Sequence, residues 1–243
     1  ISEKSMSKLR ILVSGDKGFV GTETVKLLKE EGHIVEGFDL MNCQDVRDIE
    51  GLDRVVDGFR PDRILHLAAI ARFADADKDP QLAFETNVQG TKNVTAIAMK
   101  YHIPLCYAST GSVLMPIDPK MIPPLTEEFP VKGNSVYGCT KYVGETYVRK
   151  HTPHIILRYS HLAGLEKRYH GLVGGFISRI ERGLAPQLMG GGQSNDFLDV
   201  RDVARANVLA LTAPWDKWNQ VYNIGSGVEM TAKEAGDIVC KYM

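Results

Sequence analysis

The stretch from Val13 to Gly21, Val-Ser-Gly-Asp-Lys-Gly-Phe-Val-Gly, constrains the fold more than any other part of the sequence. It follows a short apolar run and leads into a helix-like segment, Phe19 to Glu31. A strand, a glycine turn and a helix start present backbone N–H groups and the positive end of a helix dipole, which suit a pyrophosphate. Gly15 permits the tight turn, Gly18 lets a phosphate approach, and Gly21 lets helix and strand pack closely.

Three glycines at this spacing also fit any tight β-turn-α corner, so the next acidic residue matters. Asp39 follows a second apolar run, His33 to Phe38, at about the 20-residue spacing of carboxylates that bind a ribose diol. A carboxylate near the 2′ position repels a 2′-phosphate, and no arginine follows immediately to bind one. Asp39 therefore predicts a dinucleotide fold and favours NAD over NADP as the cofactor.

Strand-like and helix-like segments alternate along most of the chain, which predicts parallel crossovers and a doubly wound parallel sheet, an α/β Rossmann fold. Further strands are expected at 63–69, 105–109 and 154–159, and helices up to about residue 58 and at 81–101, 134–150, 176–182 and 202–212. Five prolines between residues 116 and 130 predict an irregular segment. The alternation fades from about residue 162. We therefore expect a dinucleotide-binding domain at 7–161 and a small C-terminal substrate lobe at 162–243, interleaved with elements that return to the sheet.

Tyr137 and Lys141 lie four residues apart, so a helix places the phenol and the ammonium on one face. A free phenol has a pKa near 10, too high for a base at neutral pH, but a nearby lysine cation favours the phenolate. Tyr137 can then take a proton from a substrate hydroxyl while hydride leaves the same carbon. Lys141 can also hydrogen-bond the nicotinamide ribose. The same spacing occurs on solvated helix faces, and the glycine turn upstream favours the catalytic interpretation.

Ser109 and Thr110 end an expected strand and so lie at the carboxyl edge of the sheet, where open α/β sheets bind ligands. A hydroxyl there can hydrogen-bond the reacting oxygen and share its charge in the transition state. It can equally cap the strand end, and the companion Tyr137 favours catalysis. Ala68 and Ala69 form the C-terminal end of another expected strand. Such small residues let a flat ligand lie against the backbone, or simply pack tightly.

With the glycine turn, the acid, the hydroxyl and the Tyr/Lys pair in this order, the chain resembles the extended short-chain dehydrogenase/reductase family. Its nucleotide-sugar epimerase/dehydratase branch is the most similar. The resemblance covers nearly the whole chain and rests on motifs at 15–21, 66–69, 87–91, 109–113, 196–204 and 222–225. It implies a Rossmann fold, bound NAD, a small-molecule substrate such as a nucleoside diphosphate sugar, and a homodimer paired through the helices expected at 81–101 and 134–150.

The resemblance also implies roles for individual residues. Catalytic positions are matched by Thr110, Tyr137 and Lys141. Contacts to the cofactor are implied for Gly15, Gly18, Phe19, Val20, Gly21, Asp39, Asp45, Val46, Leu67, Ala68, Ala69, Asn87, Tyr137, Lys141 and Tyr159. Contacts to the substrate are implied for Ser109, Ser112, His161 and Asn195.

Departures from the family pattern bear on the substrate. Gly111-Ser112 stand where dehydratases carry Asp-Glu, so 4,6-dehydration is not expected. Ser160-His161 stand where epimerases usually carry Phe-Asn, and Asn195 replaces an arginine that would bind phosphate through two hydrogen bonds. Relatives continue further after the last motif, so either the C-terminus is missing here or the substrate pocket is small and open. The positive charge of the missing arginine can be supplied by Arg168, Arg179 or Arg182. Alternatively, these three are ordinary surface residues.

Three functions fit these residues. An NAD-dependent nucleotide-sugar epimerase would use Tyr137 to deprotonate a sugar hydroxyl, and hydride would leave the sugar and return to its other face. A dehydrogenase or keto-reductase of a sugar or sugar acid would run half of this cycle with net cofactor turnover, and the missing phosphate donors favour it. An NAD-sensing binding module need not keep Tyr137 and Lys141 at helical spacing.

Composition and charge argue against nucleic-acid-binding, membrane, secreted and metal-binding proteins. A formal net charge of −1 over 243 residues gives no electrostatic reason to expect nucleic acid or an anionic membrane as partner. No apolar stretch approaches the roughly 20 residues that span a bilayer, and the first residues do not resemble a secretion signal. The four cysteines and seven histidines show no paired or clustered spacing. We therefore expect a cytoplasmic protein with reduced thiols and no metal site.

Overall fold

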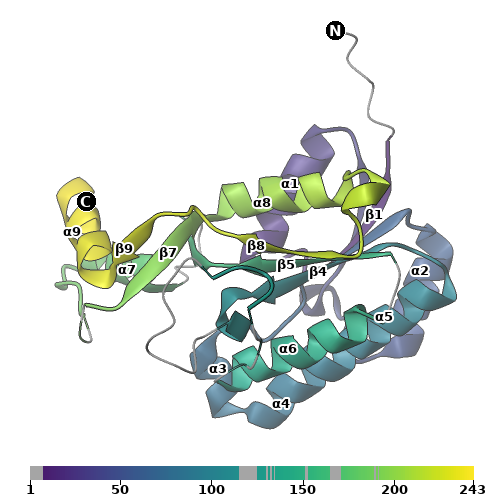
Figure 1. Cartoon of the computed structure of the whole chain (residues 1–243), viewed down its shortest axis with the longest axis horizontal. Coiled ribbons are helices and arrows are strands. Elements are labelled where there is room, and N and C mark those ends of the chain that lie inside the picture. Colours follow the sequence, from purple (N-terminus) through teal and green to yellow (C-terminus); the bar gives the residue numbers. More distant parts are fainter. Residues whose placement is uncertain are drawn as a thin grey trace, which may run out of the picture.

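A six-stranded parallel sheet forms the centre of the protein (Figure 1). The computed structural model describes residues 8–114, 125–129, 131, 133, 135–150, 153–164, 171–188, 190 and 192–243. The sheet has the order β2-β1-β3-β4-β5-β8. Its strands are β1 (Arg10–Ser14), β2 (Ile34–Phe38), β3 (Arg63–His66), β4 (Leu105–Thr110), β5 (His154–Tyr159) and β8 (Gln220–Ile224). The predicted doubly wound parallel sheet is confirmed.

The strand order turns back at β1, because the chain leaves β1 for β2 on one side and continues through β3 on the other. The carboxyl end of β1 is therefore the topological switch point, where sheets of this kind bind ligands. Strands β4 and β5 are buried along their whole length, which explains why they appear in the sequence as short apolar runs. The strand expected at 63–69 ends earlier, at His66, and residues 67–69 form a loop at the carboxyl edge.

Helices cover both faces of the sheet. Helices α1 (Phe19–Glu30) and α8 (Val200–Leu211) lie on one face, and Figure 1 shows five further helices of the first part of the chain on the other. These are α2 (Ile49–Phe59), α3 (Phe73–Lys78), α4 (Pro80–Phe84), α5 (Gly90–Lys100) and α6 (Val136–Val148). Short 3-10 turns lie at Leu40–Asn42, Gly111–Leu114 and Trp215–Lys217.

The long helix expected at 81–101 is continuous in space but not uniform. A π-helical turn, Glu85–Gln89, separates α4 from α5. Asn87 within this turn is fully buried and anchors a neighbouring loop. Apolar periodicity predicts only that a helix is present, whereas the π turn depends on this contact between distant residues.

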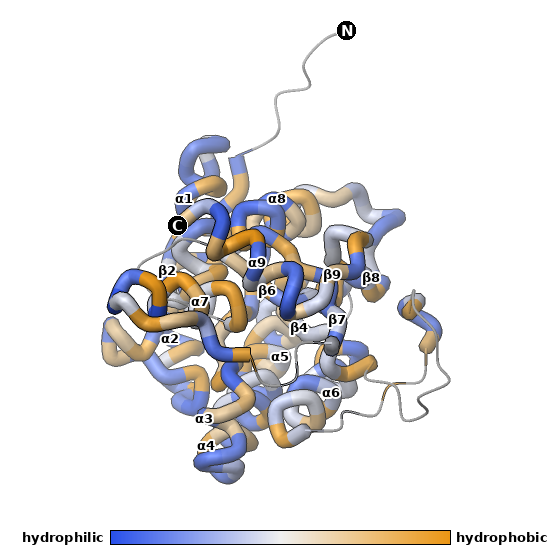
Figure 2. Tube along the Cα trace, turned by 90° about the vertical axis from the view of Figure 1, so that its left-hand side faces the viewer, coloured by the Kyte–Doolittle hydropathy of each residue, from blue (hydrophilic) through white to orange (hydrophobic). Residues whose placement is uncertain are grey.

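A small lobe follows the sheet at its carboxyl edge. Its strands are β6 (His161–Ala163), β7 (Ser194–Asp199) and β9 (Glu229–Thr231), in the order β6-β7-β9, with β7 and β9 antiparallel. Its helices are α7 (Gly171–Glu181) and α9 (Ala232–Tyr242). Phe176 and Ile177 of α7 pack with Val239 of α9 in a separate apolar core, and Figure 2 views this lobe from its outer side.

The helix expected at 176–182 is therefore longer and begins at Gly171, because packing against α9 outweighs the low helix propensity of its glycines. Helix α8 and strand β8 return to the main sheet between the strands of the lobe. A division at residue 162 stays a prediction. The prolines at 116, 119, 123, 124 and 130, as well as Arg168, lie outside the described residues. None of the described helices has the length and hydropathy of a transmembrane segment.

Candidate active site

The glycine turn has the geometry that its sequence predicts. Gly15 has φ of +76°, and its N–H donates to the Phe38 carbonyl at 2.9 Å. A Cβ on Gly15 would lie 2.7 Å from the Ala68 nitrogen, and one on Gly21 would lie 2.1 Å from the Gly15 oxygen. A Cβ on Gly18 would meet only the Gly15 oxygen, at 3.2 Å, so the turn is open there. The N-cap of α1 is Gly18, which has no side chain to cap the helix, so the positive end is suited to an anion.

The next two residues of the motif lie at the start of α1. A Cβ on Gly164 would lie 2.9 Å from the end of the Phe19 ring, so this ring reaches the small lobe. Val20 packs into the core between α1 and the sheet. Their side chains therefore fix the position of the helix, and any contact to a cofactor from this segment stays a prediction.

Asp39 lies directly after β2 and joins this strand to the glycine turn. Its Oδ2 accepts a hydrogen bond from the Lys17 backbone N–H at 3.1 Å, and its Oδ1 accepts one from the Met41 N–H at 2.9 Å. Leu67 and Ala69 are half-buried at the same edge, in the loop after β3. The carboxylate is therefore held at the switch point, where the sequence places a ribose contact.

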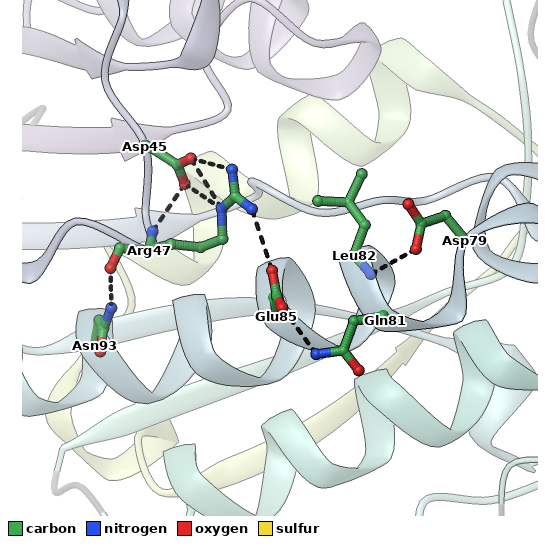
Figure 3. Close-up of polar contacts among 7 residues, drawn as sticks. All are labelled: Asp45, Arg47, Asp79, Gln81, Leu82, Glu85 and Asn93. Atoms are coloured by element: carbon green, nitrogen blue, oxygen red, sulfur yellow. Dashed lines mark hydrogen bonds and ion pairs between the residues drawn. The ribbon is translucent and has the colours of Figure 1, made fainter.

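Figure 3 shows the loop that the family resemblance connects with the adenine ring. Arg47 donates to Asp45 from Nε at 2.9 Å and from Nη2 at 2.6 Å, and reaches Glu85 at 3.4 Å. These hydrogen bonds from Arg47 lower the pKa of the Asp45 carboxyl. Asn93 donates to the carbonyls of Val46 and Arg47, both at 3.0 Å. The loop is thus fixed to the helix that runs through α4 and α5, and the Val46 side chain is buried.

Asn87 is fully occupied by protein groups. Its Oδ1 accepts from the Ile70 N–H at 2.7 Å, and its Nδ2 donates to the Ile70 carbonyl at 3.0 Å and to Thr140 Oγ1 at 2.9 Å. The amide therefore ties the loop after β3 to α6. The Asn87 side chain therefore positions this loop, and we do not propose that it also contacts the cofactor.

Three of the predicted chemical groups meet at the carboxyl end of β4. Thr110 Oγ1 lies 3.2 Å from Ser112 Oγ and accepts from the Ser112 N–H at 3.2 Å. Burial raises the pKa of Tyr137 to about 12, and the neighbouring Thr110 side chain opposes the rise. The Tyr137 ring also packs edge-on against Phe73, with ring centres 5.4 Å apart.

Lys141 follows one helical turn after Tyr137 and is 2% exposed. Its Nζ lies 4.2 Å from the centre of the Tyr107 ring. No carboxylate or hydroxyl of the described residues lies within hydrogen-bond distance of this ammonium. Burial lowers the pKa of Lys141 to about 7, and the Glu145 charge opposes the fall. Among the described residues this ammonium contacts the Tyr107 ring but no hydrogen-bond acceptor, so it can donate to the diol of a ribose.

A buried ion pair behind Thr110 was not identified from the sequence. Arg158 of β5 donates from Nε and Nη2 to the two oxygens of Glu145 in α6, at 2.9 and 2.8 Å. The Ser109 hydroxyl donates to the same carboxylate at 2.6 Å. All three side chains are buried, so Ser109 supports the strand end and we do not propose it as a substrate contact. Arg158 stands in an otherwise largely apolar strand, and this feature of the sequence could have indicated a buried ion pair.

His66 forms a second buried connection that sequence reasoning missed. The Ser14 hydroxyl lies 2.6 Å from Nδ1, and Nε2 lies 3.0 Å from Thr91 Oγ1. Because Thr91 donates its own proton to the Asn87 carbonyl at 2.6 Å, Nε2 is the donor and Nδ1 the acceptor. Burial lowers the pKa of His66 to about 3, so the ring stays neutral. The His66 ring therefore links β1, β3 and α5 at the carboxyl end of the sheet.

The Tyr159 hydroxyl is bound by a residue of α8. Its hydroxyl lies 2.5 Å from Asn207 Oδ1, and Asn207 Nδ2 donates to Thr24 Oγ1 at 3.0 Å. The phenol thus joins β5 to α8 and α1. The predicted contact of Tyr159 to the cofactor stays a prediction.

The predicted substrate residues of the small lobe lie around β6 and β7. His161 is exposed, and its ring centre lies 6.0 Å from that of Phe197. Burial of its ring nitrogens lowers the pKa of His161, and Asp196 opposes this. Asn195 pairs with Met230 across β7 and β9. A cavity of about 220 Å³ lies between β6, β7 and α7, next to these residues.

The remaining candidates for chemistry are the arginines of the small lobe, groups that could bind a metal ion, and the cysteines. Arg179 donates to the Ala185 carbonyl at 2.7 Å, and Arg182 is exposed. Among the described residues no group of three or more potential ligands could hold a metal ion. The four cysteines are free: Cys43, Cys106, Cys139 and Cys240.

Known proteins are similar to this chain in sequence and in fold. A sequence profile of the NAD dependent epimerase/dehydratase family matches residues 11–225. A protein of Methanocaldococcus jannaschii, provisionally assigned as a UDP-glucose 4-epimerase, is 31% identical over 253 residues, 94% of this chain and 81% of the relative. Thermus thermophilus UDP-glucose 4-epimerase in complex with NAD has a TM-score of 0.85 at 30% identity. Thermotoga maritima UDP-glucose 4-epimerase, solved with UDP-glucose, has a TM-score of 0.87 at 28% identity. Each structural match covers 96% of this chain and 82% of the other.

Proposed function

This chain belongs to the NAD-dependent epimerase/dehydratase family, and on that premise we propose that it is a nucleotide-sugar epimerase that works through a transient keto sugar. The observation that carries the proposal is the position of Tyr137 in α6, where the Thr110 hydroxyl is near enough to lower the pKa of the phenol. The buried ammonium of Lys141 lies one helical turn away. This is the arrangement that proton removal from a sugar hydroxyl needs.

NAD fits the residues around the switch point. The turn at Gly15 and Gly21 has no room for a side chain, the Asp39 carboxylate borders it, and Lys141 lacks a partner among the described residues. These residues would hold the pyrophosphate, the adenosine ribose and the nicotinamide ribose, respectively. Bound NAD supplies the acceptor and donor of the hydride, and its oxidised ring carries a positive charge.

The side chains of this protein move and stabilise the proton. Tyr137 takes the hydroxyl proton as the carbonyl forms, and returns it when the carbonyl is reduced from the other face. Because burial raises the pKa of Tyr137 to about 12, the phenolate depends on nearby positive charge, which the protonated form of Lys141 and the oxidised nicotinamide ring would supply. The Thr110 hydroxyl hydrogen-bonds the reacting oxygen and shares its charge.

The substrate is proposed to be a nucleoside diphosphate sugar. The relatives solved with NAD and with UDP-glucose support this class of ligand. The cavity between β6, β7 and α7 is lined by Phe197, whose ring lies against His161, and by Gly164, which adjoins Phe19 of α1. His161 and Ser112 are the substrate contacts that we retain, because both lie at the open carboxyl edge.

A dehydrogenase or keto-reductase is the second candidate, and the absence of an arginine at Asn195 favours it. Incubation with UDP-glucose or UDP-galactose separates the two functions. An epimerase forms the other sugar nucleotide with unchanged NADH absorbance, whereas a dehydrogenase produces net NADH. Mass spectrometry of the small molecules released on denaturation would identify the bound cofactor and sugar nucleotide.

Tyr137→Phe is expected to lower the turnover rate by about 100-fold or more, because it removes the general base. NAD affinity, measured separately, should remain unchanged, since the ring and its packing on Phe73 are kept. Full activity of this variant would contradict the mechanism and favour a non-catalytic NAD-binding module.

We also propose a homodimer paired through the helices α4–α5 and α6. Phe84, Met99 and Tyr142 on these helices are exposed apolar side chains, which a partner copy would cover. Size-exclusion chromatography with light scattering tests this, and a monomer at all concentrations would contradict it. Location in the cytoplasm and a preference for NAD over NADP also belong to this proposal.

A further inference from the structure

The glycine turn carries a buried carboxylate, Asp16, between Gly15 and Lys17. Its side chain is 5% exposed, and its Oδ2 lies 3.0 Å from Lys17 Nζ. Oδ1 has no hydrogen-bond partner among the described residues. A buried acceptor without a partner is costly, and in a native protein it indicates a water, ion or ligand that supplies the missing donor.

The position of this carboxylate depends on Gly37 of β2. Gly37 pairs with Val13 of β1, directly beside the switch point. A Cβ at position 37 would lie 2.3 Å from both Cγ and Oδ2 of Asp16. Only glycine therefore leaves space for the carboxylate, and the strand and the turn are matched to hold it over the carboxyl end of β2.

Asp16 shares this place with Asp39, the carboxylate expected to bind the ribose diol. Lys17 contacts both, through its ammonium to Asp16 and through its backbone N–H to Asp39. Arg47, the first arginine after Asp39 in the chain, is held by Asp45 (Figure 3). A 2′-phosphate here would meet two carboxylates whose neighbouring cations are already paired. A free diol instead offers hydroxyl donors to them.

We propose that Asp16 Oδ1 accepts a hydrogen bond from the adenosine ribose of NAD, and that Asp16 and Asp39 together set the preference for NAD over NADP. This role rests on the proposed function, since it needs a nicotinamide dinucleotide in the crevice. It adds a second acidic contact to the one that the family resemblance implies at Asp39.

Isothermal titration of the full chain with NAD and with NADP, after dialysis against nucleotide-free buffer, tests this role. Asp16→Ala removes the acceptor and should weaken NAD binding by about tenfold. Asp16→Asn removes the charge with little change in shape and should strengthen NADP binding by about threefold to tenfold. Asp216→Asn, which makes the same change in net charge at an exposed residue, should leave both affinities unchanged.

The outcomes separate this role from the function on which it rests. If the wild type binds no dinucleotide, both fail. If it binds NAD and the preference for NAD over NADP falls by less than about threefold in either Asp16 variant, only the role of Asp16 is overturned. A supporting result is a preference that falls by at least about threefold in each variant.

A second measurement needs no ligand. Gly37→Ala must displace the Asp16 carboxylate in the wild type, but meets no carboxylate in an Asp16→Ala background. Urea unfolding should therefore show that Gly37→Ala raises the unfolding constant by about tenfold or more in the wild type, and by less than about threefold in Asp16→Ala. Equal effects in both backgrounds would show that Gly37 does not hold Asp16 and would overturn the proposal.

Discussion

Replacing Lys141 with methionine is expected to stabilise the folded protein while abolishing the proposed reaction. The ammonium is 2% exposed, and burial lowers its pKa from 10.5 to about 7, against the opposing effect of Glu145. Below pH 7, folding therefore buries a charge that the unfolded chain exposes to water. At about 1.4 kcal/mol per pKa unit, this burial costs the folded state about 5 kcal/mol. Loss of the contact between Nζ and the Tyr107 ring removes about 2 kcal/mol, so a net gain of about 3 kcal/mol is expected.

The sign of the pH dependence follows from the two pKa values. Between about pH 7 and pH 10.5 the folded lysine is neutral while the unfolded lysine keeps its proton. The unfolded state then binds more protons, so the stability of the wild type rises with pH. The advantage of Lys141→Met is therefore largest at or below pH 7 and fades toward pH 10.5.

Urea unfolding of the wild type and Lys141→Met at pH values of about 6.5, 8 and 9.5 measures this difference. Lys141→Arg keeps a buried cation and serves as the control, for which no gain is expected. The reasoning is refuted if Lys141→Met is less stable than the wild type at the lowest pH, or if its advantage does not shrink as the pH rises.

Two further predictions concern ion pairs of different burial. Glu145→Ala leaves the buried Arg158 guanidinium without its carboxylate, with only the Glu127 carbonyl to accept from it, and should lower the free energy of unfolding by about 3–5 kcal/mol, measured by urea unfolding; a loss below about 1 kcal/mol would contradict it. Arg47→Gln breaks the half-exposed contact with Asp45 and should change stability by about 1 kcal/mol at most. Calorimetry should nevertheless show weaker NAD binding in this variant, and an unchanged affinity would mean that the loop position does not matter to the nucleotide.

The local features of the fold could be predicted because their causes are local. The glycine turn needs small residues at fixed positions, and close contacts at Gly15 and Gly21 show why. The spacing of Tyr137 and Lys141 needs only a helix. Both were therefore available from a single sequence, as was the alternation of strands and helices.

Contacts between distant residues could not be predicted in this way. Ser109 and Thr110 are adjacent and both carry hydroxyls, yet Ser109 is bound by Glu145 while Thr110 meets Tyr137. Only the packing of α6 on the sheet distinguishes them. Tyr159 likewise turns toward Asn207, on a helix far along the chain. Such partners follow from tertiary structure, which propensity and periodicity do not encode.

The π-helical turn at Glu85–Gln89 sets the rotational phase of the long helix. Each residue advances a helix by about 100°, so removing one residue within the turn would rotate the two halves relative to each other by about that angle. Val94 and Ile97 are now buried against the sheet. After such a rotation they could not stay buried there while Asn87 remains hydrogen-bonded to Ile70. Insertions and deletions should therefore be tolerated at the ends of this helix but not at its centre, a difference that thermal unfolding of single-residue deletions would reveal.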